Sequence, residues 1–183
     1  MSRHGQAALV LLCLFSGAAV AQSATREDVE DGFAAAVLEY CLPAIVGNTP
    51  VDSVVADTEG WGLTTPSRGR SARMPGATLW EIDGLGGIVA IEDNVPEFCI
   101  VMAYGPRIRQ LFVSMEAGVL AHEAGLTLTT NDDEPRQLQF RRQYDTDVGG
   151  REITLTLSGN EPGAPGTASR FSTATAFVTS RPV

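Results

Sequence analysis

Residues 126–179 alternate apolar and polar side chains in four short runs, and this period of two constrains the fold more than any other feature of the chain. The runs are residues 126–130, 137–144, 152–158 and 169–179, separated by turn-forming clusters at 131–133, 147–150 and 159–166. Such alternation predicts half-buried strands. We therefore expect four antiparallel strands whose apolar face needs a second layer to cover it.

A helix that can supply this layer is predicted just upstream. Pro106 suits the first turn of a helix, and Gly125 closes it. Five apolar residues between them recur at helical spacing: Ile108, Leu111, Phe112, Met115 and Val119. A stripe of this kind predicts a helix that lies with one face on a core.

The first half of the chain has a similar order. Apolar residues at helical spacing after an N-cap at Thr25 predict a helix that ends at Cys41, before Pro43, and residues 50–56 suit a short second helix. Residues 64–76 lack an apolar period and predict a mobile loop. Three strands follow at 78–82, 88–91 and 97–104, the first two joined by a glycine-rich hairpin connection.

This order predicts a single α+β domain over residues 22–183. We expect a mainly antiparallel sheet with two longer helices packed on one face. The order also suggests two α-β-β-β units, although no residue-level repeat accompanies them.

The first 21 residues have the pattern of a secretory signal peptide. Arg3 supplies the positive charge, residues 7–15 the apolar core, and Ala19-Val20-Ala21 the small-residue cleavage site. The apolar run is shorter than the roughly 20 residues of a membrane span. We expect cleavage before Gln22 and a soluble periplasmic or secreted product.

The remaining chain is acidic. Because Arg3 is the one basic residue of 13 inside the predicted signal, 12 arginines face 22 acidic residues, a net charge of −10. This charge argues against nucleic acid as a partner. The chain contains no lysine, which excludes Schiff-base chemistry.

Two cysteines, Cys41 and Cys99, lie after the predicted signal. In an oxidising compartment such a pair is expected to form a disulfide. The link would join the end of the first helix to a sheet strand, and its reduction should loosen the first half first. A redox pair would need CxxC spacing, which is absent.

Structural residues in the first half resemble a group of small, uncharacterised exported proteins of Gram-negative bacteria. The residues that carry the resemblance are Cys41, Gly60-Trp61, Trp80, Gly87 with Val89 and Ile91, and Cys99 with Val101. It covers about the first 85 residues after the predicted signal. The resemblance implies a periplasmic protein without known activity, and it assigns no functional residue.

Three short motifs resemble known metal, catalytic or nucleotide-binding patterns. His122, the one histidine after residue 21, lacks the second histidine of a zinc motif and is typical of a helix C-terminus. Residues 145–150 begin like a calcium loop, but Thr156 stands where the twelfth-position Glu belongs. Residues 84–87 could be mistaken for a nucleotide loop, yet no helix follows them. The last two are interpreted as hairpin turns, and no cofactor or metal is expected.

Arg68, Arg70 and Arg73 form a basic cluster in the loop at 64–76 and are our candidate binding residues. We favour a non-catalytic binding or envelope-associated protein that uses the sheet face or this loop. Its partner would be a protein, a peptide or an anionic envelope component. The alternative is a hydrolase in which His122 acts as general base with an acid such as Glu123 or Glu116.

Overall fold

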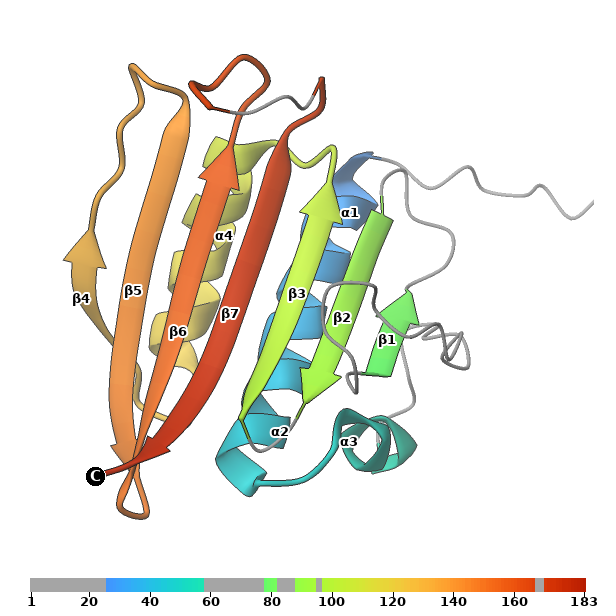
Figure 1. The fold of residues 1–183 in the computed structure, drawn as a ribbon, viewed down its shortest axis with the longest axis vertical. Coiled ribbons are helices and arrows are strands. Elements are labelled where there is room, and N and C mark those ends of the chain that lie inside the picture. The colour runs from blue at the N-terminus through green and yellow to red at the C-terminus, as the bar shows by residue number, and fades with distance from the viewer. Residues whose placement is uncertain (1–25, 58–77, 82–87, 95–96, 167–169) are drawn as a thin grey trace, which may run out of the picture.

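The computed structural model describes residues 26–57, 78–81, 88–94, 97–166 and 170–183. Seven strands form one antiparallel sheet in the order β1-β2-β3-β7-β6-β5-β4 (Figure 1). The strands are β1 (Thr78–Glu81), β2 (Ile88–Asn94), β3 (Phe98–Tyr104), β4 (Thr127–Asn131), β5 (Gln139–Val148), β6 (Arg151–Asn160) and β7 (Thr173–Pro182). The predicted α+β class and the antiparallel sheet are thus confirmed.

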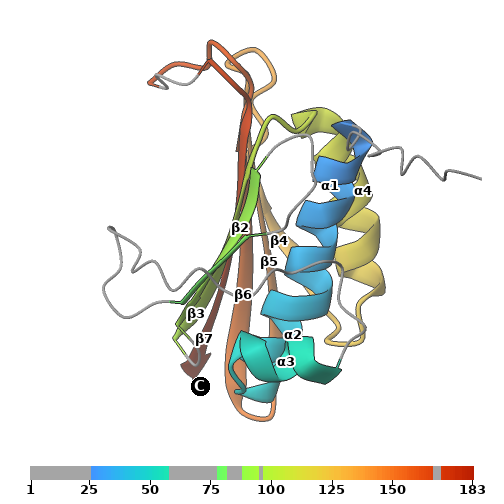
Figure 2. The same ribbon diagram turned by 90° about the vertical axis from the view of Figure 1, so that its right-hand side faces the viewer.

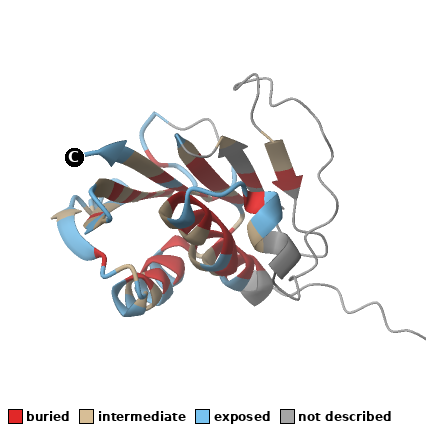
Figure 3. Ribbon diagram, turned by 90° about the horizontal axis from the view of Figure 1, so that it is seen from below, coloured by how far each residue is buried: buried red, intermediate tan, exposed pale blue. Residues whose placement is uncertain are grey.

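The helices lie on one face of the sheet, as Figure 2 shows. They are α1 (Arg26–Ala35), the π-helix η1 (Ala36–Cys41), α2 (Leu42–Gly47), α3 (Val51–Asp57) and α4 (Ile108–Ala121). Buried residues gather between this layer and the sheet (Figure 3), and β6 alternates between half-buried and buried positions from Glu152 to Asn160. The five predicted stripe residues of α4 are all buried. None of the described helices lies on the opposite face of β3, β7, β6 and β5 (Figure 2).

The predicted end of the first helix at Cys41 is wrong, because the helical path continues to Gly47. A proline inside an α-helix removes one backbone hydrogen bond and clashes with the preceding turn. Here the turn before Pro43 widens into η1, where the Leu42 N–H donates to the carbonyl of Val37, five residues back. The segments α1, η1 and α2 follow one another without a break, and α4 with 14 residues is the other long helix-forming stretch.

Two glycines let α4 approach its neighbours closely. A Cβ on Gly159 of β6 would lie 2.7 Å from Ile108 Cγ2 and 2.8 Å from Phe112 Cε2, and one on Gly118 would lie 2.6 Å from Leu38 Cδ1. Such distances are too short for carbon atoms in contact. The absence of a side chain at Gly159 thus lets α4 pack closely on the sheet, and its absence at Gly118 lets α4 pack closely on η1.

A buried carboxylate fixes the start of α4. Glu30 of α1 is 5 % exposed and accepts a hydrogen bond from the backbone N–H of Arg107, whose guanidinium lies 3.4 Å away. A carboxylate at a helix N-terminus also interacts favourably with the helix dipole. This contact joins the two helical segments of the layer.

The sheet order is symmetric about the β3–β7 pair. On one side lie β3, β2 and β1, and on the other β7, β6 and β5, with β4 added at the edge. In the chain β1–β3 follow the first helical segments, whereas α4 is followed by the four strands β4–β7, so the second half has one strand more than the suggested α-β-β-β unit. The central pair joins residues about 75 positions apart, such as Ile100 and Phe177.

The predicted Cys41–Cys99 disulfide is present. The two Cα atoms lie 5.5 Å apart, inside the usual range for a disulfide, and both residues are fully buried. The link pins the end of η1 to β3, near the centre of the sheet.

Several expectations fall on residues outside the described part of the chain: the signal peptide at 1–21, the loop at 64–76 and the glycine-rich connection at 83–87. Among the described residues, no helix is long and apolar enough to cross a bilayer.

Candidate functional site

The three candidate binding residues, Arg68, Arg70 and Arg73, also lie outside the described residues, so their surroundings are not part of the structure. The remaining sequence candidates can be placed.

His122 is the C-cap residue of α4, and its ring is held by a local hydrogen bond. The backbone N–H of Ala124 donates to His122 Nδ1 over 3.1 Å. When Nδ1 of a neutral imidazole accepts a hydrogen bond, the ring carries its hydrogen on Nε2. Nε2 can then only donate, which is the reverse of what a general base needs.

Neither of the two acids that were considered as partners of His122 has a contact with its ring among the described interactions. Glu116 binds the guanidinium of Arg142 over 3.0 Å, on the side of α4 that faces β5. Glu123 is exposed and lines a shallow groove of about 580 Å³ together with His122, Pro43, Val46 and Asp147. The geometry at His122 thus gives the hydrolase alternative no support.

The calcium-like motif is part of a hairpin. Asp145 and Asp147 belong to β5, and the turn to β6 consists of Gly149 and Gly150, with φ of 62° and 76°. Positive φ at both central residues is typical of a type I′ turn, which suits the twist of a hairpin. The part of the chain that the structure describes has no cluster of three or more His, Cys, Asp or Glu residues placed to hold a metal ion.

An ion network lies between α4 and β5. The Arg142 guanidinium, 12 % exposed, contacts Asp133 at 2.6 Å and Glu116 at 3.0 Å, and it lies 5.4 Å from the centre of the Phe112 ring. Beside it, burial raises the pKa of the fully buried Tyr144 hydroxyl. Arg142 of β5 thus joins the strand to Glu116 of α4 and to Asp133, which precedes the strand.

The open face of the three central strands is nearly free of charge. On this face β3 carries Phe98, Ile100, Met102 and Tyr104, β7 carries Thr173, Thr175, Phe177 and Thr179, and β6 carries Thr154, Thr156, Ser158 and Asn160. Of these residues Ile100 is buried, at 7 % exposure. We call these twelve residues the uncharged strip. The one charged pair on this face of the three strands is Glu152 with Arg181, 2.7 Å apart at one end.

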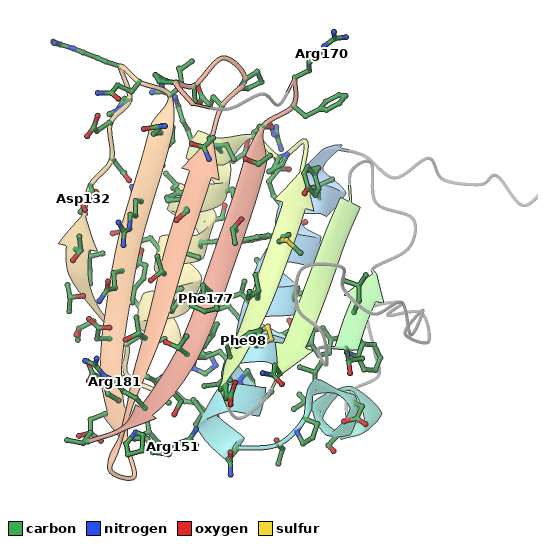
Figure 4. All side chains as sticks on the ribbon, in the orientation of Figure 1. Phe98, Asp132, Arg151, Arg170, Phe177 and Arg181 are labelled. Atoms are coloured by element: carbon green, nitrogen blue, oxygen red, sulfur yellow. A yellow bond between two sulfur atoms is a disulfide. The ribbon has the colours of Figure 1, made fainter. Side chains whose placement is uncertain are left out.

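Aromatic rings lie at both ends of the strip on β3, where Phe98 and Tyr104 stand, and Phe177 on β7 lies one row in from Phe98. Figure 4 shows Phe98 and Phe177 near one another on the face toward the viewer, and their ring centres lie 5.8 Å apart. Phe177 is 38 % exposed and Tyr104 is 40 % exposed. Depletion of charge with enrichment of aromatic residues and methionine is the composition of protein–protein interface cores.

A hydrogen-bonded carboxylate flanks the strip on β5. Asp145 accepts hydrogen bonds from Thr129 on β4, Thr154 on β6 and Gln143 on its own strand. Burial alone would raise the pKa of Asp145, but these three donors, with the positive charge of Arg181, lower it below 3.8. Asp145 therefore ties three strands together at the edge of the open face.

This carboxylate gives a pH-dependent prediction. We expect Asp145→Asn to lower the free energy of unfolding by about 1–2 kcal/mol at neutral pH, since donors aimed at a carboxylate lose a charged acceptor. Because the folded pKa is depressed, the stabilisation is present above the unfolded value of 3.8 and is lost as pH falls through the lower folded value. Urea unfolding at neutral and acid pH measures both effects.

The control for this prediction is Asp147→Asn, an exposed carboxylate two residues further along the same strand. It should change stability by less than about 0.5 kcal/mol. Equal losses in the two variants, or a loss for Asp145→Asn that does not shrink in acid, would contradict the assigned role.

The fold and this face define a class: an α+β protein with one helix-covered and one open sheet face. Comparison of the chain with protein-family models, with curated proteins and with solved structures finds no match.

Sequence reasoning did not single out the uncharged strip, although one signal was present. Positions 98, 100, 102 and 104 are as apolar as the core positions 99, 101 and 103, and Ile100 among them is itself buried. A strand of this kind is apolar on both faces, whereas the strands at 152–158 and 173–179 alternate. Such a strand either has both faces covered by its own chain or offers one face to a partner.

Proposed function

We propose that this chain is a non-catalytic binding protein and that the open face of β3, β7 and β6 is its interaction surface. The observation that carries the proposal is the uncharged strip, with Phe177 and Tyr104 each more than a third exposed on a chain in which 19% of residues are charged. The disulfide supports a location in an oxidising compartment such as the periplasm.

The chemistry of the strip favours a polypeptide partner over an anionic envelope component. Arginine and lysine form the strongest contacts with phosphate groups, and the strip contains neither. Aromatic rings, methionine and threonine hydroxyls instead suit a protein surface with apolar groups and neutral hydrogen-bonding groups.

Site-specific photocrosslinking in the producing cell tests this proposal. A photoreactive phenylalanine analogue is placed at Phe177 on the strip or, as control, at Val113, which is 68 % exposed on α4. We expect a discrete cross-linked species from position 177 and none from position 113, because only the first position lies in the proposed interface. The same result from both positions, or none from position 177, would reject the open face as the interaction surface.

A further inference from the structure

We propose that a polar hollow at one corner of the open sheet face binds a neutral saccharide. The hollow has a volume of about 620 Å³, within the range of about 300–1,000 Å³ that small-molecule sites have. It lies where residues 132–134 run beside the ends of β5 and β6, and Figure 4 labels Asp132 at this corner. The hollow shares only Ser158 and Asn160 with the uncharged strip, so this inference goes beyond the proposed function and does not depend on it.

The chain after β4 brings two carboxylates to the open face. The register of β4 with β5 continues past Asn131, because the N–H of Asp132 donates to the carbonyl of Arg141 over 2.9 Å and Glu134 forms a bridge with Gln139. Residues opposite one another in an antiparallel pair lie on the same face. Asp132 therefore shares a face with Arg141, and Glu134 shares it with Gln139.

Strand β6 completes the site. Arg141 is paired with Ser158, and Gln139 is paired with Asn160. The buried Phe140 between Arg141 and Gln139 lies on the opposite face, toward α4. The hollow is thus lined on the open face by two rows of polar side chains, Asp132, Arg141 and Ser158 in one and Glu134, Gln139 and Asn160 in the other.

The charged groups of the site are available to a ligand. Asp132, Glu134 and Arg141 are exposed, and within the described part of the chain their side chains form no ion pair or hydrogen bond with another residue. Asp133, between the two carboxylates, is instead held by Arg142 on the other side of the sheet. Gln139 donates its Nε2 hydrogen to the carbonyl of Pro165, which leaves its Oε1 as an acceptor.

The mixture of charges excludes simple ions as the ligand. An anion would be attracted by Arg141 but repelled by Asp132 and Glu134, and a small cation would meet the reverse. The described residues also contain no group of three or more His, Cys, Asp or Glu placed to hold a metal ion. An apolar ligand would find no exposed apolar side chain, because Phe140 is 7 % exposed.

Hydroxyl groups match the donors and acceptors of the hollow. A hydroxyl both donates and accepts a hydrogen bond, so it can donate to the carboxylates of Asp132 and Glu134 and accept from the guanidinium of Arg141. Ser158, Asn160 and Gln139 accept further hydroxyl protons, and Asn160 also donates. A molecule with several adjacent hydroxyls and no net charge can satisfy all of these groups at once, and a saccharide is such a molecule.

The dimensions of the site suit a short saccharide. The three columns of side chains span two strand spacings, or about 9.6 Å, and the two rows lie two residues apart, or about 6.6 Å. This area accommodates a disaccharide lying along the rows. Since every contact replaces one with water, we expect a Kd on the order of 1 mM.

Titration of the full, oxidised chain followed by two-dimensional amide NMR tests the proposal. The probes are maltose and N,N′-diacetylchitobiose, each added up to about 20 mM, well above the expected Kd. Maltoheptaose presents the maltose unit within a longer chain, and it should bind more tightly than maltose if the natural ligand is a polysaccharide rather than a free sugar. We expect at least one disaccharide to give saturable shifts confined to residues 132–134, 139–141 and 158–160.

Two site variants and one control locate the binding. Arg141→Met and Asp132→Ala each remove hydrogen bonds to a charged group and should weaken binding about fivefold or more. Arg136→Met makes the same substitution at an exposed arginine of the same turn that does not line the hollow, and it should leave the affinity unchanged. The amide spectrum identifies any variant that fails to fold, in which case the other site variant decides.

Three results would overturn the saccharide site. The first is the absence of saturable shifts with both disaccharides and with maltoheptaose. The second is equal binding by the wild type and by both folded site variants. The third is a response of the same amides to about 20 mM sodium phosphate and not to the sugars, which would make the hollow an anion site governed by Arg141.

Discussion

Replacing Cys41 and Cys99 together by alanine is expected to lower the free energy of unfolding by about 4 kcal/mol. The disulfide closes a loop of 58 residues, and in the chain-entropy model a cross-link over that length restricts the unfolded chain by about this amount. Since small domains are stable by only about 5–15 kcal/mol, most of the margin could be lost. Urea unfolding of the oxidised wild type and the double variant measures the difference.

The reduced wild-type protein is the matched control, because it keeps both sulfur atoms and loses only the link. Both cysteines are fully buried, so alanine also leaves small cavities, and the double variant should be slightly less stable than the reduced wild type. A reduced protein as stable as the oxidised one would show that the link contributes nothing and that any loss in the variant comes from packing.

The place where stability is lost is also predicted. Strands β5, β6 and β7 are paired with one another over ten residues each and do not depend on the disulfide. The segments η1 and α2 are held to the sheet by packing and by this link. Hydrogen exchange of the reduced protein should therefore show earlier loss of protection in residues 36–47 than in β6.

The spacing of apolar residues was sufficient to predict those helices and strands that keep one face buried along their whole length. The apolar stripe of α4 predicted its five buried residues, and the period of two predicted β5, β6 and β7 because one face of each is buried and the other is not. The hairpin at Gly149-Gly150 followed from turn chemistry alone. These features depend on neighbours within a few residues in the chain.

The features that sequence reasoning missed depend on distant residues. The continuation past Pro43 needs the wider π turn of η1, which rests against the sheet, and no local propensity indicates it. The pairing of β3 with β7 joins segments far apart in the chain, and the hydrogen bonds of Asp145 come from three strands. The uncharged strip appears only when these strands are placed side by side.

Removal of the Arg142 side chain is expected to cost about 3 kcal/mol of folding stability. Its guanidinium is 12 % exposed and compensates two carboxylates, Asp133 at 17 % and Glu116 at 38 % exposure. Breaking a buried ion pair by deleting one partner leaves the other charge without compensation, and this penalty exceeds the value of the pair itself. Arg142→Ala is therefore compared with the wild type by urea unfolding.

A second ion pair of the chain serves as a matched control, because its nitrogen–oxygen distance is nearly the same but its arginine is exposed. Arg181 lies 2.7 Å from Glu152, as close as Arg142 is to Asp133, but its side chain is 74 % exposed. Exposed pairs contribute little to stability because water screens both charges, so Arg181→Ala should have a small effect. A second variant, Arg142→Met, separates charge from packing, because it keeps an apolar side chain against the Phe112 ring while removing the cation. If Arg142→Met is nearly as stable as the wild type, the apolar part of the side chain stabilises the fold here and the charge does not. If Arg142→Ala and Arg181→Ala lose equal stability, burial does not decide the strength of these pairs.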